Sequence, residues 1–296
     1  MSESDALGRY TRACNDCAAK VISVYSTSFG AAVRMLGRRH RVHVRNIYAL
    51  VRIADELVDG VAAEAALGPE AQRRALDQLE QQLRAAIDHG YSSNPIVHAF
   101  SVTARECGID RTLTEPFFES MRSDIDETGR GGMRTLGPLE HERYVYGSAK
   151  VVGLMCLRVF LRESRLSDGD REFAELGAEQ LGAAFQNINF LRDLADDSER
   201  LHRDYLGAGE LLDDEDRDEW IRIIDSQLDA ARRSLPLLPK DARRAVRSAL
   251  DLFAALSARL RRVPARELHV RRVRVPDPIK LAILAKAALV TLAERG

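Results

Sequence analysis

The residues best suited to chemistry are two pairs of aspartates, each pair four positions apart. Asp55 and Asp59 lie in the segment YALVRIADELVDG, and Asp193 and Asp197 lie in QNINFLRDLADD. Residues four apart share one face of a helix, and two carboxylates held that close repel each other unless a cation lies between them. A divalent cation such as Mg²⁺, which prefers oxygen ligands, meets that need.

Further polar residues share the helical faces of these aspartates. Tyr48 and Arg52 precede the first pair, and Gln186 and Asn189 precede the second, all at spacings of three or four. Arg192 adjoins the second pair. If the two faces oppose each other across a cavity, their carboxylates can hold roughly two or three Mg²⁺ ions, an arrangement that suits a diphosphate substrate.

A solvated helix face is the alternative explanation for either pair alone, because this spacing often arises by chance. Two copies carry more weight, since both lie in strongly apolar segments. INFLRDL and YALVRIADELV are too hydrophobic to lie free on a surface, and carboxylates inside such segments need a partner. We therefore predict a metal site built from both helices.

The aspartate segments belong to a series of motifs that resembles the squalene/phytoene synthase family, the head-to-head prenyl transferases. The motifs follow the family order from Ser26 to about Leu281: STSF, YALVRIADELVDG, YVYGSAKVVG, QNINFLRDLADD and RRVRVPDPIKL. GSAKVVGLMCL and NINFLRDLADD are most similar to bacterial phytoene synthases. The resemblance implies an all-α fold, with residues 1–296 forming a single-domain, isoprenoid-synthase-type helical bundle around a central cavity.

The resemblance also implies roles for individual residues. The expected metal ligands are Asp55, Asp59, Asn189, Asp193 and Asp197. The expected catalytic residues are the four aspartates and Tyr144, whose ring and hydroxyl would stabilise a carbocation or assist a proton transfer. The expected substrate- and diphosphate-binding residues are Ser26, Ser28, Phe29, Tyr48, Arg52, Ser148, Val152, Gly153, Gly182, Gln186, Asn189, Arg192, Arg203, Tyr205 and Arg272.

The sequence departs from the family pattern at three positions. Lys150 replaces a small or acidic residue and is expected to point away from the cavity. Gly207 replaces the proline that usually follows Arg-x-Tyr-Leu, and Phe253 stands where relatives often carry a tyrosine. Arg272 aligns with a phosphate-contacting arginine, although a solvated basic loop would explain it as well.

The activity implied by the resemblance is the Mg²⁺-dependent condensation of two geranylgeranyl diphosphates, with Mn²⁺ as a substitute metal. A cyclopropyl (prephytoene) diphosphate would rearrange to phytoene with release of diphosphate, in carotenoid biosynthesis. Because proton loss ends this reaction, NADPH is not expected. The alternative is squalene or dehydrosqualene synthesis from farnesyl diphosphate, since the sequence does not fix the prenyl chain length. Functional coupling to a downstream desaturase is a further expectation.

Two other classes of protein fit less well. Head-to-tail prenyl synthases usually carry Asp-Asp-x-x-Asp motifs, and Asp196-Asp197 has no aspartate at the required offset. A non-catalytic helical scaffold would have no reason to retain four aspartates together with Arg52, Tyr144 and Asn189. Incubation with labelled prenyl diphosphates and Mg²⁺ separates these classes.

Composition limits partners and location. The 296 residues are 45% hydrophobic and 30% charged, and the net charge of −1 argues against a nucleic-acid partner. We expect no signal peptide, and the longest apolar run, VVGLMCLRVFL, is short and interrupted by Arg158. We therefore expect a cytoplasmic protein that lies at most against a membrane. A C-terminal helix over 276–294 is one candidate contact, with burial in the core as the alternative.

The remaining predictions concern secondary structure and thiols. Apolar periodicity predicts helices and no strands, with the basic patch at 38–41 in a loop. Cys14 and Cys17 form a C-x-x-C without a second pair, so we expect all four cysteines to be reduced structural thiols, with a redox or metal role as the alternative. The predicted helices are 5–27, 42–59, 69–88, 94–107, 111–127, 138–163, 170–197, 216–234, 240–262 and 276–294.

Overall fold

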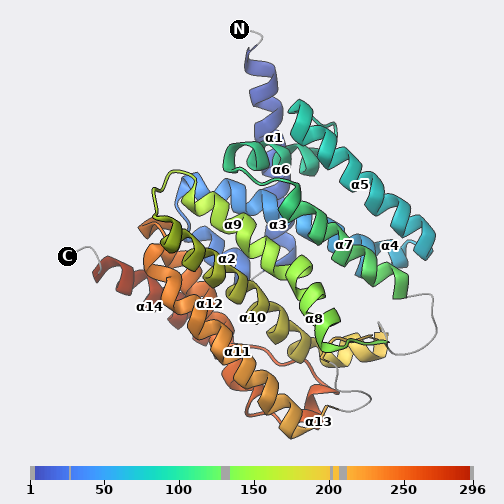
Figure 1. Cartoon of the computed structure of the whole chain (residues 1–296), viewed down its shortest axis with the longest axis vertical. Helices are drawn as coiled ribbons and strands as arrows, with labels where there is room; N and C mark the ends of the chain where they lie inside the picture. The colour runs from blue at the N-terminus through green and yellow to red at the C-terminus, as the bar shows by residue number, and fades with distance from the viewer. Residues whose placement is uncertain (1–3, 27, 128–133, 201–202, 207–211, 294–296) are drawn as a thin grey trace.

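The computed structural model describes residues 4–26, 28–127, 134–200, 203–206 and 212–293, and these are almost wholly helical, as predicted (Figure 1). The elements of the first half are α1 (Ser4–Tyr25), α2 (Ser28–Arg34), α3 (Arg38–Asp59), α4 (Val61–Glu64), α5 (Pro69–His89), α6 (Pro95–Cys107), α7 (Arg111–Glu127), β1 (Arg134–Thr135) and α8 (Pro138–Val145). Those of the second half are the π-helical turn η1 (Tyr146–Lys150), α9 (Val151–Leu161), α10 (Asp168–Arg200), β2 (Arg203–Asp204), α11 (Asp214–Ser234), the 3₁₀ turn η2 (Leu235–Leu237), α12 (Lys240–Leu260), α13 (Ala265–Leu268) and α14 (Asp277–Ala293).

The prediction for the basic patch at 38–41 is wrong. These residues form the first turn of α3 instead of a loop, and His40 within them is fully buried. The patch is ordered by α12, because the Nε of Arg39 donates to Asp241 at 2.8 Å. The helix predicted over 5–27 also differs, since α1 ends at Tyr25 and α2 begins at Ser28.

The helix predicted over 138–163 contains a π-helical turn that the sequence did not suggest. Gly147 lies inside this turn, and a Cβ there would be 2.1 Å from Ser120 Oγ and 2.2 Å from the carbonyl oxygen of Pro116. Only glycine therefore lets α7 pack so close to the turn. π-helical turns are rare and often lie at functional sites.

A short parallel pair of strands was also not predicted. β1 pairs with β2 in the register Arg134 with Arg203 and Thr135 with Asp204. Each strand has two residues, which is too short to produce an alternating pattern in the sequence. The pair joins the segment before α8 to the segment after α10.

The buried side chains form one contiguous apolar cluster, which includes Phe117, Phe118 and Met121 of α7. Helices α9, α10 and α11 run side by side, with α12 and α14 beyond them (Figure 1). Helix α3 packs against α1, α6 and α9. All four cysteines are free thiols, although Cys17 is exposed. This arrangement leaves α3 and α10, the two aspartate helices, in the centre of the molecule.

The continuous helical stretch Pro138–Leu161 is long and apolar enough to cross a membrane by length and composition alone. Its most apolar part is 61% buried within the fold. That much burial is what a core helix of a globular protein shows, and the same stretch also lines the central cavity.

Candidate active site

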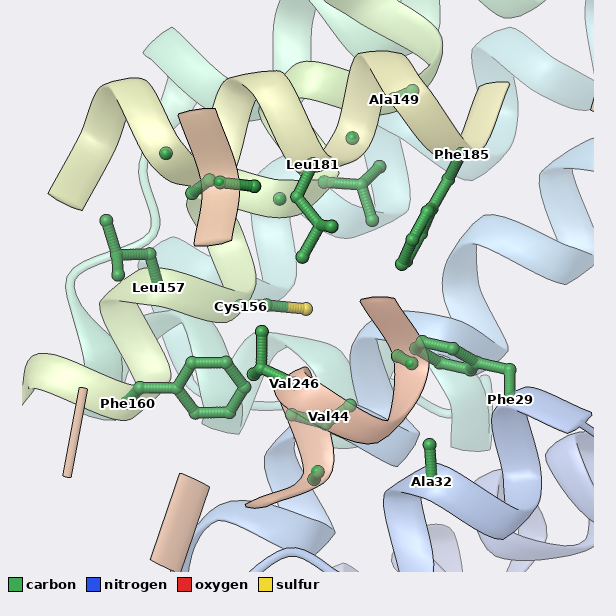
Figure 2. Close-up of a pocket in the computed structure, with 18 of the residues that line it drawn as sticks. Phe29, Ala32, Val44, Ala149, Cys156, Leu157, Phe160, Leu181, Phe185 and Val246 are labelled. Carbon is green, nitrogen blue, oxygen red and sulfur yellow. The ribbon is translucent and has the colours of Figure 1, made fainter. Parts of the chain in front are cut away.

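An apolar cavity of about 350 Å³ lies between α2, α3, α9, α10 and α12 (Figure 2). Leu157 and Phe160 of α9 lie toward one end, while Phe29 of α2 and Phe185 of α10 lie toward the other (Figure 2). Phe185 stacks on Phe253 of α12 at 3.8 Å between ring centroids. Phe253 thus forms part of the apolar wall, without the hydroxyl that a tyrosine at this position would add. The cavity can therefore hold a long hydrocarbon away from water.

Many of the residues predicted to bind substrate line this cavity. The predicted residues among the lining set are Phe29, Tyr48, Ser148, Val152, Gly153, Gly182, Gln186 and Asn189. They come from helices far apart in the sequence, and the fold brings them to one space. Lys150 is not among the lining residues: it is buried and contacts Glu142, which agrees with the expectation that it points away.

Small residues bring η1 and α9 into close contact with α10 along the cavity. A Cβ on Gly153 would be 2.5 Å from the carbonyl oxygen of Ala178, and a Cβ on Gly182 would be 2.5 Å from that of Ala149. Both obstacles are backbone atoms, which cannot turn aside. These glycines therefore allow the neighbouring helical segments to pack without a gap in the cavity wall.

Cys156 projects its thiol into the middle of the cavity (Figure 2). Burial raises the pKa of this thiol to about 12. The thiol is therefore neutral near pH 7 and acts as a small apolar wall residue, not as a nucleophile.

Each aspartate motif continues from residues that line the cavity. On α3, Tyr48 and Val51 line the cavity, and Asp55 is the next residue on that face; on α10, Asn189 lines it and Asp193 follows one turn later. The polar lining residues Tyr48, Gln186 and Asn189 lie on the stretches of α3 and α10 that continue toward these carboxylates. We call this region the polar end of the cavity.

Asp55 is held within an ion-pair cluster on α3. The Nη1 of Arg52 donates to Asp55 Oδ2 at 2.7 Å, and the same guanidinium contacts Glu56. Burial would lower the pKa of Arg52, but these two carboxylates outweigh it and raise the pKa above its usual value. The Arg52 guanidinium also lies 4.5 Å from the ring centroid of Tyr25. Glu56, for which the sequence predicted no role, therefore shares Arg52 with Asp55.

Asp193 lies between two arginines. Arg192 Nε donates to Asp193 Oδ1 at 2.9 Å, and Arg272 Nε lies 2.7 Å from the same oxygen. Arg272 comes from the segment between α13 and α14, so the fold brings the C-terminal motif to the second aspartate motif. Arg272 thus lies beside the second aspartate motif, and its role as a phosphate contact stays a prediction.

Residues of the polar end suit a divalent cation. Within the described part of the chain, the buried Oδ1 of Asn189 has no hydrogen-bond partner, one turn from Asp193. A buried amide oxygen without a donor is an available ligand for a hard cation. No group of three or more His, Cys, Asp or Glu side chains gathers as a metal site among the described residues.

Some predicted residues have side chains outside the part that the structure describes. They are Ser28, Asp59, Asp197 and Arg203. Ser26 is described and lies between α1 and α2, where its Oγ accepts a hydrogen bond from the Gly30 backbone at 3.3 Å. Its predicted role as a diphosphate ligand stays a prediction.

Tyr144 lies one turn before the lining residue Ser148 and is buried. Its hydroxyl donates to Asp124 Oδ2 at 2.8 Å, and the hydroxyl of Tyr205 donates to Asp124 Oδ1 at 3.1 Å. Asp124 was not predicted as a site residue, because α7 carries no recognisable motif around it. Burial of an aspartate to 1% exposure is the signal that identifies it.

Comparison with known proteins places this architecture in a family. The family description "Squalene/phytoene synthase" matches residues 22–278. The chain belongs to this family. As a squalene/phytoene synthase it is a head-to-head prenyltransferase of the phytoene synthase type, and the family implies prenyl diphosphate substrates and dependence on a divalent metal.

Relatives and solved structures agree with this assignment. A phytoene synthase from Pseudescherichia vulneris is 30% identical over 258 residues, which are 85% of this chain and 75% of the relative. A phytoene synthase from Mycobacterium tuberculosis is 28% identical over 67% of this chain, and the match spans 56% of that relative, so only about half of its length is represented. A dehydrosqualene synthase crystal structure superposes with a TM-score of 0.76 at 21% identity over 97% of this chain and 99% of that chain, which confirms the all-helical fold.

Proposed function

We propose that this protein is a phytoene synthase that condenses two geranylgeranyl diphosphates head to head, through a cyclopropyl diphosphate, with release of diphosphate. The observation that carries the proposal is the apolar cavity lined by Val51 and Asn189, which lie four residues before Asp55 and Asp193 on the two aspartate helices. The two named relatives, both phytoene synthases, support the choice of product.

In this proposal the polar end binds the diphosphates. Asp55, Asn189 and Asp193 would hold Mg²⁺, together with Asp59 and Asp197 one turn further along each helix. When bound, Mg²⁺ (or Mn²⁺) supplies charge neutralisation on the departing diphosphate. These carboxylates and the amide oxygen are the ligand types that Mg²⁺ prefers.

Arginines near the carboxylates would hold diphosphate oxygens directly. Arg52 and Arg272 each pair with a predicted metal ligand, Asp55 and Asp193. A guanidinium that leaves a carboxylate when a cation takes its place is free to bind phosphate. These arginines would therefore pair with carboxylates in the empty enzyme and with diphosphate oxygens in the substrate complex.

The cavity walls would protect the reacting carbocations. At about 1.5 Å per residue, the lining stretch of α10 from Ala174 to Asn189 is about 22 Å long, which suits an extended prenyl chain. Apolar walls exclude water, which would otherwise quench a cation. Tyr144, close to the polar end, places an electron-rich ring near the site of ionisation.

A second candidate is dehydrosqualene or squalene synthesis from farnesyl diphosphate. The observation that favours it is the cavity volume of about 350 Å³, which is near the lower limit for ligand pockets and suits shorter chains. Proton loss as the last step, without NADPH, distinguishes phytoene and dehydrosqualene from squalene.

The decisive experiment supplies geranylgeranyl and farnesyl diphosphate separately to the purified protein. Each is tested with Mg²⁺, Mn²⁺ or a chelator, and with or without NADPH, and the extracted hydrocarbons are identified by mass spectrometry. Phytoene formed without NADPH and abolished by the chelator is the expected result. Preferential C30 product, or turnover that requires NADPH, would overturn the phytoene proposal.

The proposal extends to location. The substrates and product are hydrophobic, so a cytoplasmic enzyme that touches a membrane peripherally would exchange them with lipid and pass product to a desaturase. Ile279 and Leu281 of α14 are exposed to 39% and 67%, which supports α14 as the contact. Flotation with liposomes tests this, and Leu281→Asp should reduce co-flotation; unchanged flotation would exclude this contact.

A further inference from the structure

The most unusual polar group outside the metal and diphosphate ligands is the carboxylate of Asp124. It lies on α7 and is only 1% exposed. It accepts hydrogen bonds from two phenols, Tyr144 at 2.8 Å and Tyr205 at 3.1 Å. Burying a carboxylate is costly, so a fold that keeps one gains something specific from its contacts.

Aromatic packing makes this group a rigid unit. The rings of Tyr144 and Tyr205 lie 5.0 Å apart, and Tyr205 stacks on Phe190 at 4.4 Å with 12° between the ring planes. Phe190 is the neighbour of Asn189, which lines the cavity. The unit therefore connects α7, α8, α10 and the residue after β2 next to the polar end.

Helix α7 holds Tyr144 at two points. Asp124 binds its hydroxyl, and Ser120, one turn earlier on α7, donates from its Oγ to the Tyr144 carbonyl at 3.2 Å. The π-helical turn begins two residues after Tyr144, and a π turn shifts the helical hydrogen-bond ladder by one residue. Ser120 thus supports the backbone where that shift begins, while Asp124 fixes the side chain.

We propose that Asp124 is a positioning residue for the head-to-head reaction: it orients the Tyr144 hydroxyl so that its proton points to α7 and its ring stays beside the polar end. A phenol that donates to a carboxylate carries more electron density on its oxygen and ring, which strengthens the attraction of a carbocation to that ring. This inference rests on the proposed role of Tyr144 and adds the group that sets its orientation.

The role predicts an effect on turnover more than on substrate binding. Asp124→Asn retains the shape but replaces one acceptor oxygen with a donor nitrogen, so one phenol loses its acceptor. We expect kcat to fall by roughly 10- to 100-fold with KM within about threefold of wild type, as for loss of an interaction that acts in the transition state. Asp124→Glu, which retains the charge, should recover part of the loss.

A double-mutant cycle separates positioning from general stability. If Asp124 acts through the Tyr144 hydroxyl, Tyr144→Phe with Asp124→Asn should be no slower than the slower single variant. Asp77→Asn is the matched control. The Asp77 carboxylate lies 2.8 Å from Nε of Arg122 on α7 and pairs with this arginine instead of with a phenol, so the variant should retain wild-type kcat. Fully additive losses in kcat would overturn the proposal and indicate a structural role.

The assay also distinguishes failure of the inference from failure of the proposed function. Wild-type protein that forms no head-to-head product from either prenyl diphosphate would refute the function itself. Wild-type turnover with unchanged kcat in Tyr144→Phe would overturn the role of Asp124 alone. That conservative variant retains the ring, so the test remains decisive even if Asp124→Asn does not fold.

Discussion

The Nε atom of Arg272 lies 2.7 Å from Oδ1 of Asp193, although the two residues are 79 positions apart in the sequence. The contact joins the C-terminal motif to the second aspartate motif at the polar end of the cavity. An arginine so placed compensates the carboxylate charge before substrate arrives, and it can bind diphosphate once a cation has replaced it.

Arg272→Gln is therefore expected to weaken diphosphate binding. Loss of one charge-assisted hydrogen bond corresponds to about 1.5–3 kcal/mol, or roughly a 10- to 100-fold higher KM for the prenyl diphosphate. Steady-state kinetics at saturating Mg²⁺ would measure it. Arg271→Gln is the matched control, because Arg271 pairs with Glu267 instead, and it should leave KM unchanged. Equal effects in both variants would contradict a specific role for Arg272.

Asp55→Ala and Asp193→Ala are each expected to lower activity by at least about 100-fold, because each removes a proposed ligand of the catalytic metal. Helical content should stay near wild type, since neither side chain belongs to the buried apolar cluster. Circular dichroism and product formation measure the two effects. Asp225→Ala removes an exposed carboxylate paired with Arg261 and serves as the control. Normal turnover of either site variant in Mg²⁺ would disprove the assignment.

The helical fold could be predicted from local patterns, whereas most residues of the cavity wall were expected only from the resemblance to the squalene/phytoene synthase family. Apolar periodicity identifies helices, and helical spacing places Tyr48 before Asp55 and Asn189 before Asp193 on shared faces.

The features that could not be predicted depend on contacts between distant segments. The π-helical turn lies where Gly147 packs against α7, and the apolar periodicity of the sequence does not predict it. Asp124 is recognisable only through partners 20 and 81 positions away. The basic patch at 38–41 has the composition of a loop, yet its bond to Asp241 on α12 makes it part of α3. Sequence alone gives no measure of such pairings.

Filling the middle of the cavity should shorten the accepted prenyl chain. Cys156 projects into this space, so Cys156→Phe would block access to the end formed by Leu157 and Phe160 (Figure 2). We expect the ratio of kcat/KM for geranylgeranyl to farnesyl diphosphate to fall by roughly tenfold or more, because overpacking affects the longer chain most. Cys156→Ala, which only enlarges the space, should not lower this ratio. A Phe variant with an unchanged ratio would show that chains do not reach this position.

Gly182→Ala should destabilise the protein and impair activity together. Its Cβ would meet Ala149 O at 2.5 Å and Lys150 Cα at 3.1 Å, both backbone atoms, so η1 and α10 must separate. We expect a loss of about 1–3 kcal/mol in the free energy of unfolding, measured by urea denaturation. At Gly169 of the same helix a Cβ would meet nothing within 4 Å, so Gly169→Ala should be neutral or stabilising by about 0.5 kcal/mol. Equal stability of the two variants would argue against close packing at Gly182.

His43 lies in the second turn of α3 and is buried. Its Nδ1 lies 3.1 Å from Thr103 Oγ1, and its Nε2 contacts the guanidinium of Arg162. Burial, followed by the positive charge of Arg162, lowers the pKa of His43 to about 4. The carboxylate of Glu106, 3.5 Å away, does not offset this, because it is exposed to solvent.

The lowered pKa makes stability depend on pH. Between about pH 6.5, the pKa of histidine in the unfolded chain, and about pH 4, the unfolded chain binds a proton at this imidazole but the folded protein does not. The free energy of unfolding therefore decreases as the pH falls through this range. Lowering the pKa from 6.5 to about 4 corresponds to at most about 3.4 kcal/mol. His43→Gln should remove this contribution, so its unfolding free energy, measured by urea titration at each pH, should fall less steeply than that of wild type. Thr103→Val removes the hydrogen bond but leaves the imidazole buried, and it should retain the wild-type slope. Identical slopes for His43→Gln and wild type would mean that folding does not lower the pKa of the imidazole.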